Sequence, residues 1–589
     1  MNKRFGINAY HSLPLEKKHD VWRYIILFMS GISVFLIPLL HIRQTALVRD
    51  WGYFNALSHV VRSSVLHYHT FPLHNPWVLG GVDILANPQS RVFSPFVLYD
   101  ILFSAPYANL YALITLAIVG SFGFYKLLTY LGIHKNIAVV GSIVFIHGSW
   151  FALHFTEGHI TFGSFLLMGL AFYYILRLQE QRYKLYYALL NAFFLLDGAI
   201  YVFIFTNLLL IFAVVTCTHE LRPLKFFKSI FQQWKTGVLS LFLFACFASV
   251  KLIPFLMLHR DRHPYLEAVS IPWNFMVHIL FDPCQEIMKL VDGKYFGFGF
   301  HEMGVYIGLL SFVLVVSFLF ISRKRNLIPY VFIMLLFFWI GTGWWEDVNP
   351  WQLFKKLPIV NNAHVQSRLF IVPFLIFVVL LCFALNYYRT KMRPIYLYGI
   401  MTLLVMEALF VSAYPYYKAF TYPDATCQTP KFNHLITSTT IDKTIASTDP
   451  SGFCFEHYFY NNTGAKNTYE PAAIQGDIFA EGDSLYKGEI FLATGAGRVS
   501  LESYTPAHIH IRYDLDRTSE IGLNINYLLG WKSSNPSVTI ADSNGTLVLK
   551  PTNLKGEADI FYRPNYLYII LPLFAIGVLL SIIVLIKRK

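Results

Sequence analysis

A few ionisable residues stand at the ends of long apolar stretches, where charges are costly and therefore often functional. Asp50 follows the first apolar stretch directly. A carboxylate at such a boundary can accept a proton from a hydroxyl group, which makes Asp50 a candidate general base. The alternatives are a helix cap and an ion pair with Arg49.

Two short turns between later apolar stretches supply further candidates. Glu157 and His159 share the turn Thr156-Glu-Gly-His159, and Asp197 occupies the turn Leu196–Tyr201. Together with Asp50 they offer three carboxylates and one imidazole, a set that suits Mn²⁺ or Mg²⁺. Hydrogen-bonded polar residues that close helix ends are the alternative interpretation.

His301 and Glu302 precede the eighth apolar stretch and are expected at the outer N-terminus of a helix. There they either line the same pocket, with a candidate metal, or act as a cap that the helix dipole favours. No second histidine follows four residues after His301, so the zinc-protease motif is absent.

Three basic residues are candidates for holding a phosphate group. Lys251 lies inside the seventh apolar stretch, Arg260 follows it, and Arg368 opens the tenth. Cations presented from the lipid boundary suit a lipid-linked phosphate or pyrophosphate. Their aliphatic stems could equally extend along lipid to reach the headgroups.

A loop with two Asn-Pro turns combines a flat aromatic ring with amide groups. It contains Asn75, Trp77, Asn87 and Gln89, around Gly80-Gly81. Aromatic rings with amide donors are a common way to hold a sugar, and the same residues are also ordinary turn formers.

The elements that must position these residues are membrane helices. Of the 589 residues, 55% are hydrophobic and 14% are charged, against roughly 25% charged in soluble proteins. Apolar runs of about 20 residues are long enough to cross a bilayer, and the sequence predicts twelve. Their approximate ranges are 24–42, 107–131, 137–155, 160–176, 185–199, 201–217, 236–258, 304–322, 327–345, 368–388, 395–414 and 566–586.

The distribution of charge predicts the orientation. The seven segments on the side of the N-terminus carry 23 Lys and Arg residues against four acidic residues, so their net charge is +19. Because the net charge of the whole chain is +13, the remaining residues sum to −6. The positive-inside rule then places both termini in the cytoplasm of a protein of the cytoplasmic (inner) membrane. The basic balance reports topology, and nucleic acid is excluded as a partner.

Most of the chain outside the membrane falls on the opposite, extracytoplasmic side. Loops are expected at 43–106, 259–303 and 346–367, within a membrane module of residues 1–414. Residues 415–565 change to strand-like alternation and predict a β-rich domain, in which Val538–Leu549 forms a hairpin around Asn544-Gly545. Cys427 and Cys454 are a candidate disulfide there. Residues 566–589 form the last membrane helix and a basic cytoplasmic tail.

The whole pattern resembles the GT-C superfamily of integral membrane glycosyltransferases, and more specifically the bacterial YfhO-type membrane protein family. The motifs that carry the resemblance are Asn75–Gly81, Asp197–Tyr201, Glu302–Gly308, Leu357-Pro358 with Ser367–Phe370, Asn526–Lys532 and Ala558–Pro564.

The resemblance implies transfer of a sugar from a polyprenyl-phosphate donor to a hydroxyl group on the outer face, usually with inversion. The acceptor would be an envelope glycan or lipid, and Asp50 matches the family's catalytic acid in the first loop. Two rival hypotheses remain: a transporter or flippase of lipid-linked glycan, and a non-catalytic envelope assembly protein whose working part is the β-rich domain.

Overall fold

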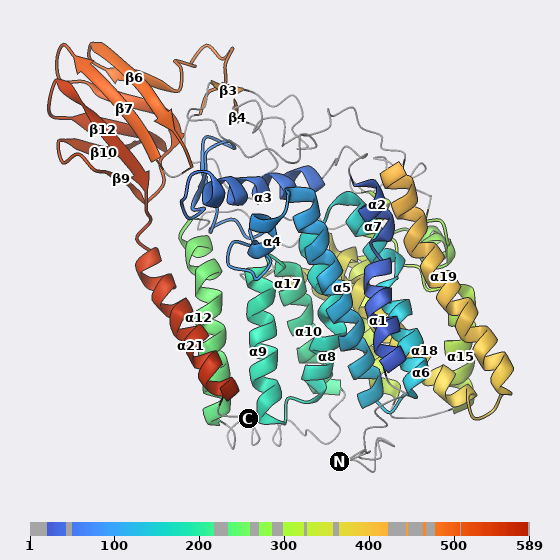
Figure 1. Cartoon of the computed structure of the whole chain (residues 1–589). Helices are drawn as coiled ribbons and strands as arrows, with labels where there is room; N and C mark the ends of the chain where they lie inside the picture. Colours follow the sequence, from blue (N-terminus) through green and yellow to red (C-terminus); the bar gives the residue numbers. More distant parts are fainter. Residues whose placement is uncertain are drawn as a thin grey trace.

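A computed structural model describes residues 21–42, 50–216, 234–258, 270–285, 299–322, 327–356, 365–421, 443–445, 463–466, 478–506 and 508–586. A layer of packed helices forms the body of the molecule, and a β-rich domain stands beyond one end of that layer (Figure 1). Arg260, Leu357-Pro358, Cys427 and Cys454 lie outside the described residues.

A helix stands at each of the twelve predicted apolar stretches. In chain order these stretches contain α1 (Val21–Ser33) with α2 (Leu36–His41), α5 (Ala105–Tyr130), α6 (Lys135–Ile146) with α7 (Ser149–Glu157), η1 (Ile160–Leu167) with α8 (Met168–Leu176), α9 (Gln181–Leu196), α10 (Ile200–Thr216), α12 (Trp234–Leu258), α15 (Leu309–Ser322), α16 (Ile328–Thr342), η6 (Gln366–Phe370) with α18 (Ile371–Tyr388), α19 (Pro394–Thr421) and α21 (Leu567–Ile586).

Six helical segments among the described residues are long and apolar enough to cross a membrane. Five other apolar helices there have 10–17 residues, so a count of twelve crossings stays a prediction. The six segments are Ala105–Tyr130, Lys135–Glu157, Lys235–Leu258, Gln366–Tyr388, Pro394–Thr421 and Leu567–Val584.

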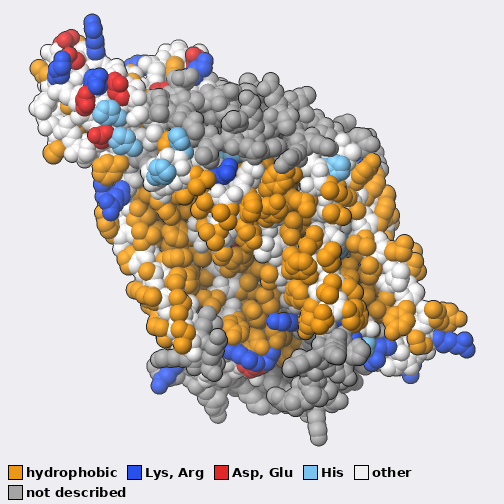
Figure 2. Space-filling view, viewed as in Figure 1, with side chains coloured by type: hydrophobic (Ala, Val, Ile, Leu, Met, Phe, Trp, Pro, Cys, Tyr) orange, Lys and Arg blue, Asp and Glu red, His pale blue; other side chains and the backbone are white. Residues whose placement is uncertain are grey.

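The surface agrees with a membrane environment for this layer. Apolar side chains form a belt around its middle, and Lys and Arg side chains gather at the edge farther from the β-rich domain (Figure 2). α1 begins and α21 ends on that same side (Figure 1). This is the arrangement expected when apolar side chains face lipid and basic residues face one aqueous side.

The first long loop contains a helix that the sequence analysis did not predict. α3 (Asp50–Leu66) lies across the ends of the membrane helices (Figure 1). It is followed by a short antiparallel pair, β1 (His74–Asn75) with β2 (Val82–Asp83), and by α4 (Val97–Leu102). Twelve of the 17 residues of α3 are buried, so the helix packs closely against the side of the layer that carries the β-rich domain.

The β-rich domain is built mainly from two four-stranded sheets. Their strand orders are β10-β11-β8-β5 and β6-β7-β12-β9. The strands are β5 (Ile490–Thr494), β6 (Gly497–Tyr504), β7 (His508–Leu515), β8 (Glu520–Asn526), β9 (Trp531–Ser533), β10 (Val538–Ser543), β11 (Thr546–Pro551) and β12 (Lys555–Tyr562), and a separate parallel pair joins β3 (Lys443–Ile445) to β4 (Thr463–Ala465).

The predicted hairpin is confirmed. β10 pairs antiparallel with β11, and both turn residues, Asn544 and Gly545, have positive φ, as the tight primed hairpin turn requires. Ile509 and Ile511 of β7 are fully buried, because alternate residues of a strand point to the same face.

Buried polar contacts fix the β-rich domain to the first loop. The Asn526 side-chain amide donates to the carbonyl oxygens of Leu79 (2.6 Å) and Gly81 (3.0 Å). The Asp83 carboxylate accepts hydrogen bonds from the hydroxyls of Tyr562 (2.6 Å) and Tyr566. These buried bonds make the loop and the domain one structural unit.

Candidate functional site

The end of α7 brings two histidines together. Gly158 closes the helix in the left-handed conformation (φ 93°), the backbone N–H of His159 bonds to the His154 carbonyl (3.1 Å), and that of Gly158 bonds to the Phe155 carbonyl (3.2 Å). This is the Schellman arrangement, which folds the chain back over the last helical turn. It leaves the Nδ1 atoms of His154 and His159 2.8 Å apart.

The same turn packs against the start of α3. A Cβ atom on Gly158 would lie 2.2 Å from the backbone nitrogen of Trp51, and the indole N–H of Trp51 donates to the Phe155 carbonyl (2.8 Å). The close approach places Oδ2 of Asp50 3.3 Å from Nε2 of His159. Residues about a hundred positions apart therefore form one site.

We expect Gly158→Ala to destabilise the protein by at least about 2 kcal/mol, because the new Cβ collides with backbone and the left-handed φ is strained. Gly132→Ala is the matched control, since Gly132 also has positive φ (82°) but nothing within 4 Å of the added Cβ. Thermal unfolding in detergent measures both. Equal melting temperatures for the two variants would contradict the close approach.

A buried ion pair forms the other side of the site. Arg368 donates from Nε to Oε2 of Glu302 (2.7 Å) and from its terminal nitrogen to Oε1. Both residues are buried. Burial alone would raise the pKa of Glu302, but the charge and hydrogen bonds of Arg368 lower it well below its ordinary value, so Glu302 is ionised.

The position of His301 and Glu302 differs in part from the sequence-based expectation. His301 and Glu302 lie in a single 3₁₀ turn, Phe300–Glu302, and α15 begins only at Leu309. They are therefore not at the helix N-terminus. The Glu302 carboxylate is held by Arg368 across the fold, rather than by a helix dipole.

These groups include a set that fits a divalent metal ion. One ligand atom from each of His154, His159 and Glu302 lies within 4.8 Å of the other two. Among the described residues the buried Nε2 of His154 has no hydrogen-bond partner. Two imidazoles and a carboxylate suit zinc, manganese or ferrous iron better than magnesium. His301 links Glu157 to this set, because its Nδ1 lies 3.6 Å from Oε1 of Glu157 and its Nε2 lies 3.6 Å from Oε1 of Glu302.

The site has one accessible end. The side chain of Asp50 is 26% exposed, that of His159 11%, and that of Glu302 4%. A molecule that enters from the solvent would therefore reach Asp50 first.

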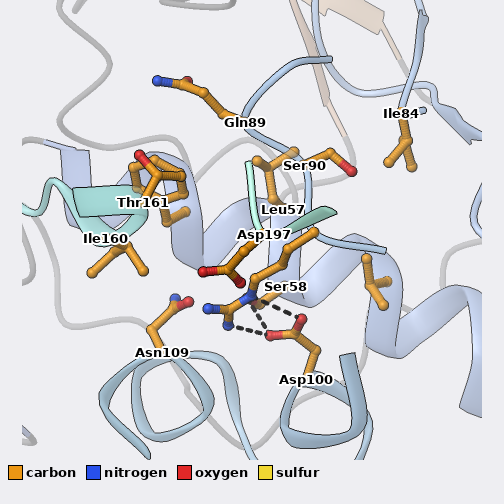
Figure 3. A pocket seen from close by; sticks show the side chains of 13 residues that line it. Leu57, Ser58, Ile84, Gln89, Ser90, Asp100, Asn109, Ile160, Thr161 and Asp197 are labelled. Atoms are coloured by element: carbon orange, nitrogen blue, oxygen red, sulfur yellow. Dashed lines mark hydrogen bonds and ion pairs between the residues drawn. The ribbon is translucent and has the colours of Figure 1, made fainter. Parts of the chain in front are cut away.

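Asp197 belongs to a neighbouring polar pocket. Its carboxylate accepts hydrogen bonds from the hydroxyls of Ser94 and Ser164, both at 2.9 Å. Arg91 and Asp100 form an ion pair in the same pocket (2.8 Å), with the Asp197 carboxylate close by (Figure 3).

Asp197 lines a pocket, and a metal site that joins it to His159 stays a prediction. Among the described residues, the set of groups that fits a metal is His154, His159 and Glu302, while the Asp197 carboxylate is bonded to two serine hydroxyls. The two places adjoin, since Ile160 and Thr161, directly after His159, line the pocket.

Lys251 has a partner within the protein. Its ammonium group donates to the backbone carbonyl of Asn87 (2.8 Å), and the Asn87 side-chain amide donates to the Tyr53 hydroxyl (2.6 Å). A phosphate is thus not needed to explain this buried cation. Phosphate binding by Lys251 and Arg368 stays a prediction.

Two residues of the expected sugar site, Asn75 and Trp77, are buried in the structure. Both side chains are 1% exposed, and Asn75 caps a tight turn by accepting from the Trp77 backbone N–H (3.2 Å). The side chain of Asn87 likewise accepts a hydrogen bond from the Gln89 backbone N–H (2.8 Å). These contacts fit the turn-forming interpretation of the loop, and a sugar site there stays a prediction.

Sequence reasoning missed His154. The sequence does contain a clue, because His154 precedes His159 by five residues and Gly158, which ends the helix, stands between them. This spacing brings the two side chains together only if the glycine ends the helix in a Schellman cap.

Comparisons with known proteins give a structural likeness only. No protein-family model matches the chain, and no curated protein matches it. A solved structure similar to this chain is the archaeal oligosaccharyltransferase AglB from Archaeoglobus fulgidus in complex with an inhibitory peptide and a dolichol-phosphate, with 9% identity, a TM-score of 0.40, and 78% of this chain and 66% of that chain covered.

A second similar structure is the oligosaccharyltransferase of Archaeoglobus fulgidus in the apo form, with 11% identity and a TM-score of 0.33. It matches 79% of this chain and 66% of that chain. The chain thus covers just under two thirds of the length of each.

Proposed function

We propose that the protein is a GT-C-type membrane glycosyltransferase. It moves a sugar from a polyprenyl-phosphate-linked donor to an acceptor hydroxyl on the extracytoplasmic face, in the cell envelope. The observation that carries the proposal is the carboxylate of Asp50, which stands at the accessible end of a buried polar site, 3.3 Å from His159.

In the proposed reaction Asp50 is the general base. The acceptor oxygen attacks the anomeric carbon of the donor, its proton passes to Asp50, and the bond from that carbon to the phosphate oxygen breaks. The lipid phosphate leaves with the bonding electrons. One displacement inverts the anomeric configuration.

His159 positions Asp50. Its Nε2 faces Asp50 while its Nδ1 faces His154, so the imidazole holds the carboxylate in one orientation. Arg368 in turn fixes Glu302 through two hydrogen bonds. A preorganised site of this kind lowers the barrier because no group reorganises during the reaction.

A divalent metal, where bound, would be held by His154, His159 and Glu302. It would supply Lewis acidity toward the charge that develops on the leaving phosphate.

The proposed orientation places the β-rich domain outside the cytoplasm. The support is the asymmetry of basic residues along the sequence and their position at the opposite edge of the apolar belt (Figure 2). Asp50 begins α3 on the same side as the β-rich domain (Figure 1). Both termini would then be cytoplasmic.

The test is sugar release from polyprenyl-monophosphate hexoses carrying a radiolabelled sugar, with the purified protein in detergent and a membrane extract as acceptor. We expect label to leave the lipid, and His159→Ala to slow this at least about 100-fold. Label that stays on every lipid would contradict transfer. Movement of intact labelled lipid across proteoliposomes would then identify a flippase.

A further inference from the structure

The outward face of one sheet of the β-rich domain carries alternating charged residues. β7 and β12 pair antiparallel, with His510 opposite Asp559 and Arg512 opposite Glu557. Because alternate residues share a face, His508 points outward with His510. The domain surface accordingly shows histidines beside acidic side chains (Figure 2).

One carboxylate oxygen joins the two histidines. Oδ1 of Asp559 lies 2.7 Å from Nε2 of His508 and 2.8 Å from Nδ1 of His510. The hydrogen bond from His510, opposed by partial burial, and then that from His508 lower the pKa of Asp559. The group is therefore an anion at neutral pH, flanked by two imidazoles.

The neighbouring residues Arg512 and Glu557 form an ion pair with each other, while Asp559 contacts the two histidines. Nε of Arg512 lies 2.8 Å from Oε1 of Glu557, while Glu557 is 3.7 Å from Nε2 of His510. Arg512 thus balances the charge of Glu557.

We propose that His508, His510 and Asp559 form a zinc-binding site on the outer surface of the β-rich domain. His-x-His on one strand and a carboxylate on its paired neighbour supply three ligands from a rigid sheet, and water completes the tetrahedral coordination. The side chains of His508, His510 and Asp559 are 41%, 26% and 46% exposed. They are therefore accessible to the ion.

The site is distinct from the cluster of His154, His159 and Glu302, and it does not depend on the proposed function. The competing explanation is a plain ladder of cross-strand ion pairs. The next pair in that ladder, Lys555 with Asp514 (2.8 Å), has no histidine and provides a matched control.

The experiment is calorimetric titration of Zn²⁺ into the full-length protein in detergent after treatment with a chelator. His159→Ala is the parent, so that the cluster in the membrane module is disabled. We expect one surface site, at least tenfold weaker after His508→Gln with His510→Gln or after Asp559→Asn. Asp514→Asn should bind as the parent does.

Melting temperatures without zinc check that each variant folds. If the double variant is unfolded, X-ray absorption of the zinc-loaded parent counts the ligands, and two imidazoles per ion are expected. Unchanged zinc affinity in the folded double variant, or an ion without imidazole ligands, would overturn the proposal. The same β-domain substitutions made in the wild-type chain, with His159 intact, are expected to transfer sugar as wild type does, so failure of either proposal is recognised separately.

Discussion

Asp50→Asn is expected to lower sugar transfer from a polyprenyl-phosphate donor by about 100-fold to 10,000-fold. The amide keeps the size of the side chain and can still bond to His159, but it cannot accept a proton from the acceptor hydroxyl, and removal of a general base has an effect of this order. Initial rates of label transfer at saturating donor measure the effect. The melting temperature should stay close to that of wild type, because the Asp50 side chain is 26% exposed.

The control for this prediction is Asp514→Asn, which makes the same chemical change in an exposed ion pair of the β-rich domain. It should leave both the rate and the melting temperature unchanged. A fully active Asp50→Asn enzyme would remove this residue from the mechanism, and with it the assignment of the site.

Arg368→Met is expected to destabilise the protein by about 3–5 kcal/mol, because it leaves the buried carboxylate of Glu302 without its cation. The pair is fully engaged, with both oxygens of Glu302 accepting from Arg368. The guanidinium group also lies over the ring of Tyr201, 4.8 Å from its centroid. Thermal unfolding in detergent measures the loss as a large fall in melting temperature.

A double variant separates the missing cation from the lost packing. Glu302→Gln combined with Arg368→Met removes both charges and should recover much of the stability, because a neutral amide is cheaper to bury than an unpaired carboxylate. Arg182→Met breaks an exposed pair with Glu180 (3.4 Å) and should cost about 1 kcal/mol or less. If Arg368→Met melts as Arg182→Met does, the buried pair does not stabilise the site.

The positions of the helices could be predicted from the sequence because each depends on a local run of apolar residues. The same is true of the Val538–Leu549 hairpin, in which Asn544-Gly545 imposes the turn. α3 escaped prediction because its 17 residues mix polar and apolar types, and its burial comes from packing against other elements.

The candidate site could be predicted only as a set of separate residues. Asp50 and His159 were identified, but their contact depends on the backbone approach that Gly158 permits. The pairing of Glu302 with Arg368 joins residues 66 positions apart. Asp197 was expected either to help hold a metal or to close a helix end, and Lys251 either to bind a phosphate or to extend along lipid. Their actual partners, two serine hydroxyls and a backbone carbonyl, come from distant segments, which no local pattern encodes.

The central claim is that sugar transfer occurs at Asp50, on the side of the membrane layer that carries the β-rich domain. A structure of the protein with a bound, non-hydrolysable polyprenyl-phosphate sugar tests it most directly. We predict the anomeric carbon beside Asp50 and His159, with the phosphate toward Arg368 and the lipid chain leaving between membrane helices. A sugar bound on the opposite side of the helix layer, or with Asp50 pointing away from it, would contradict the account.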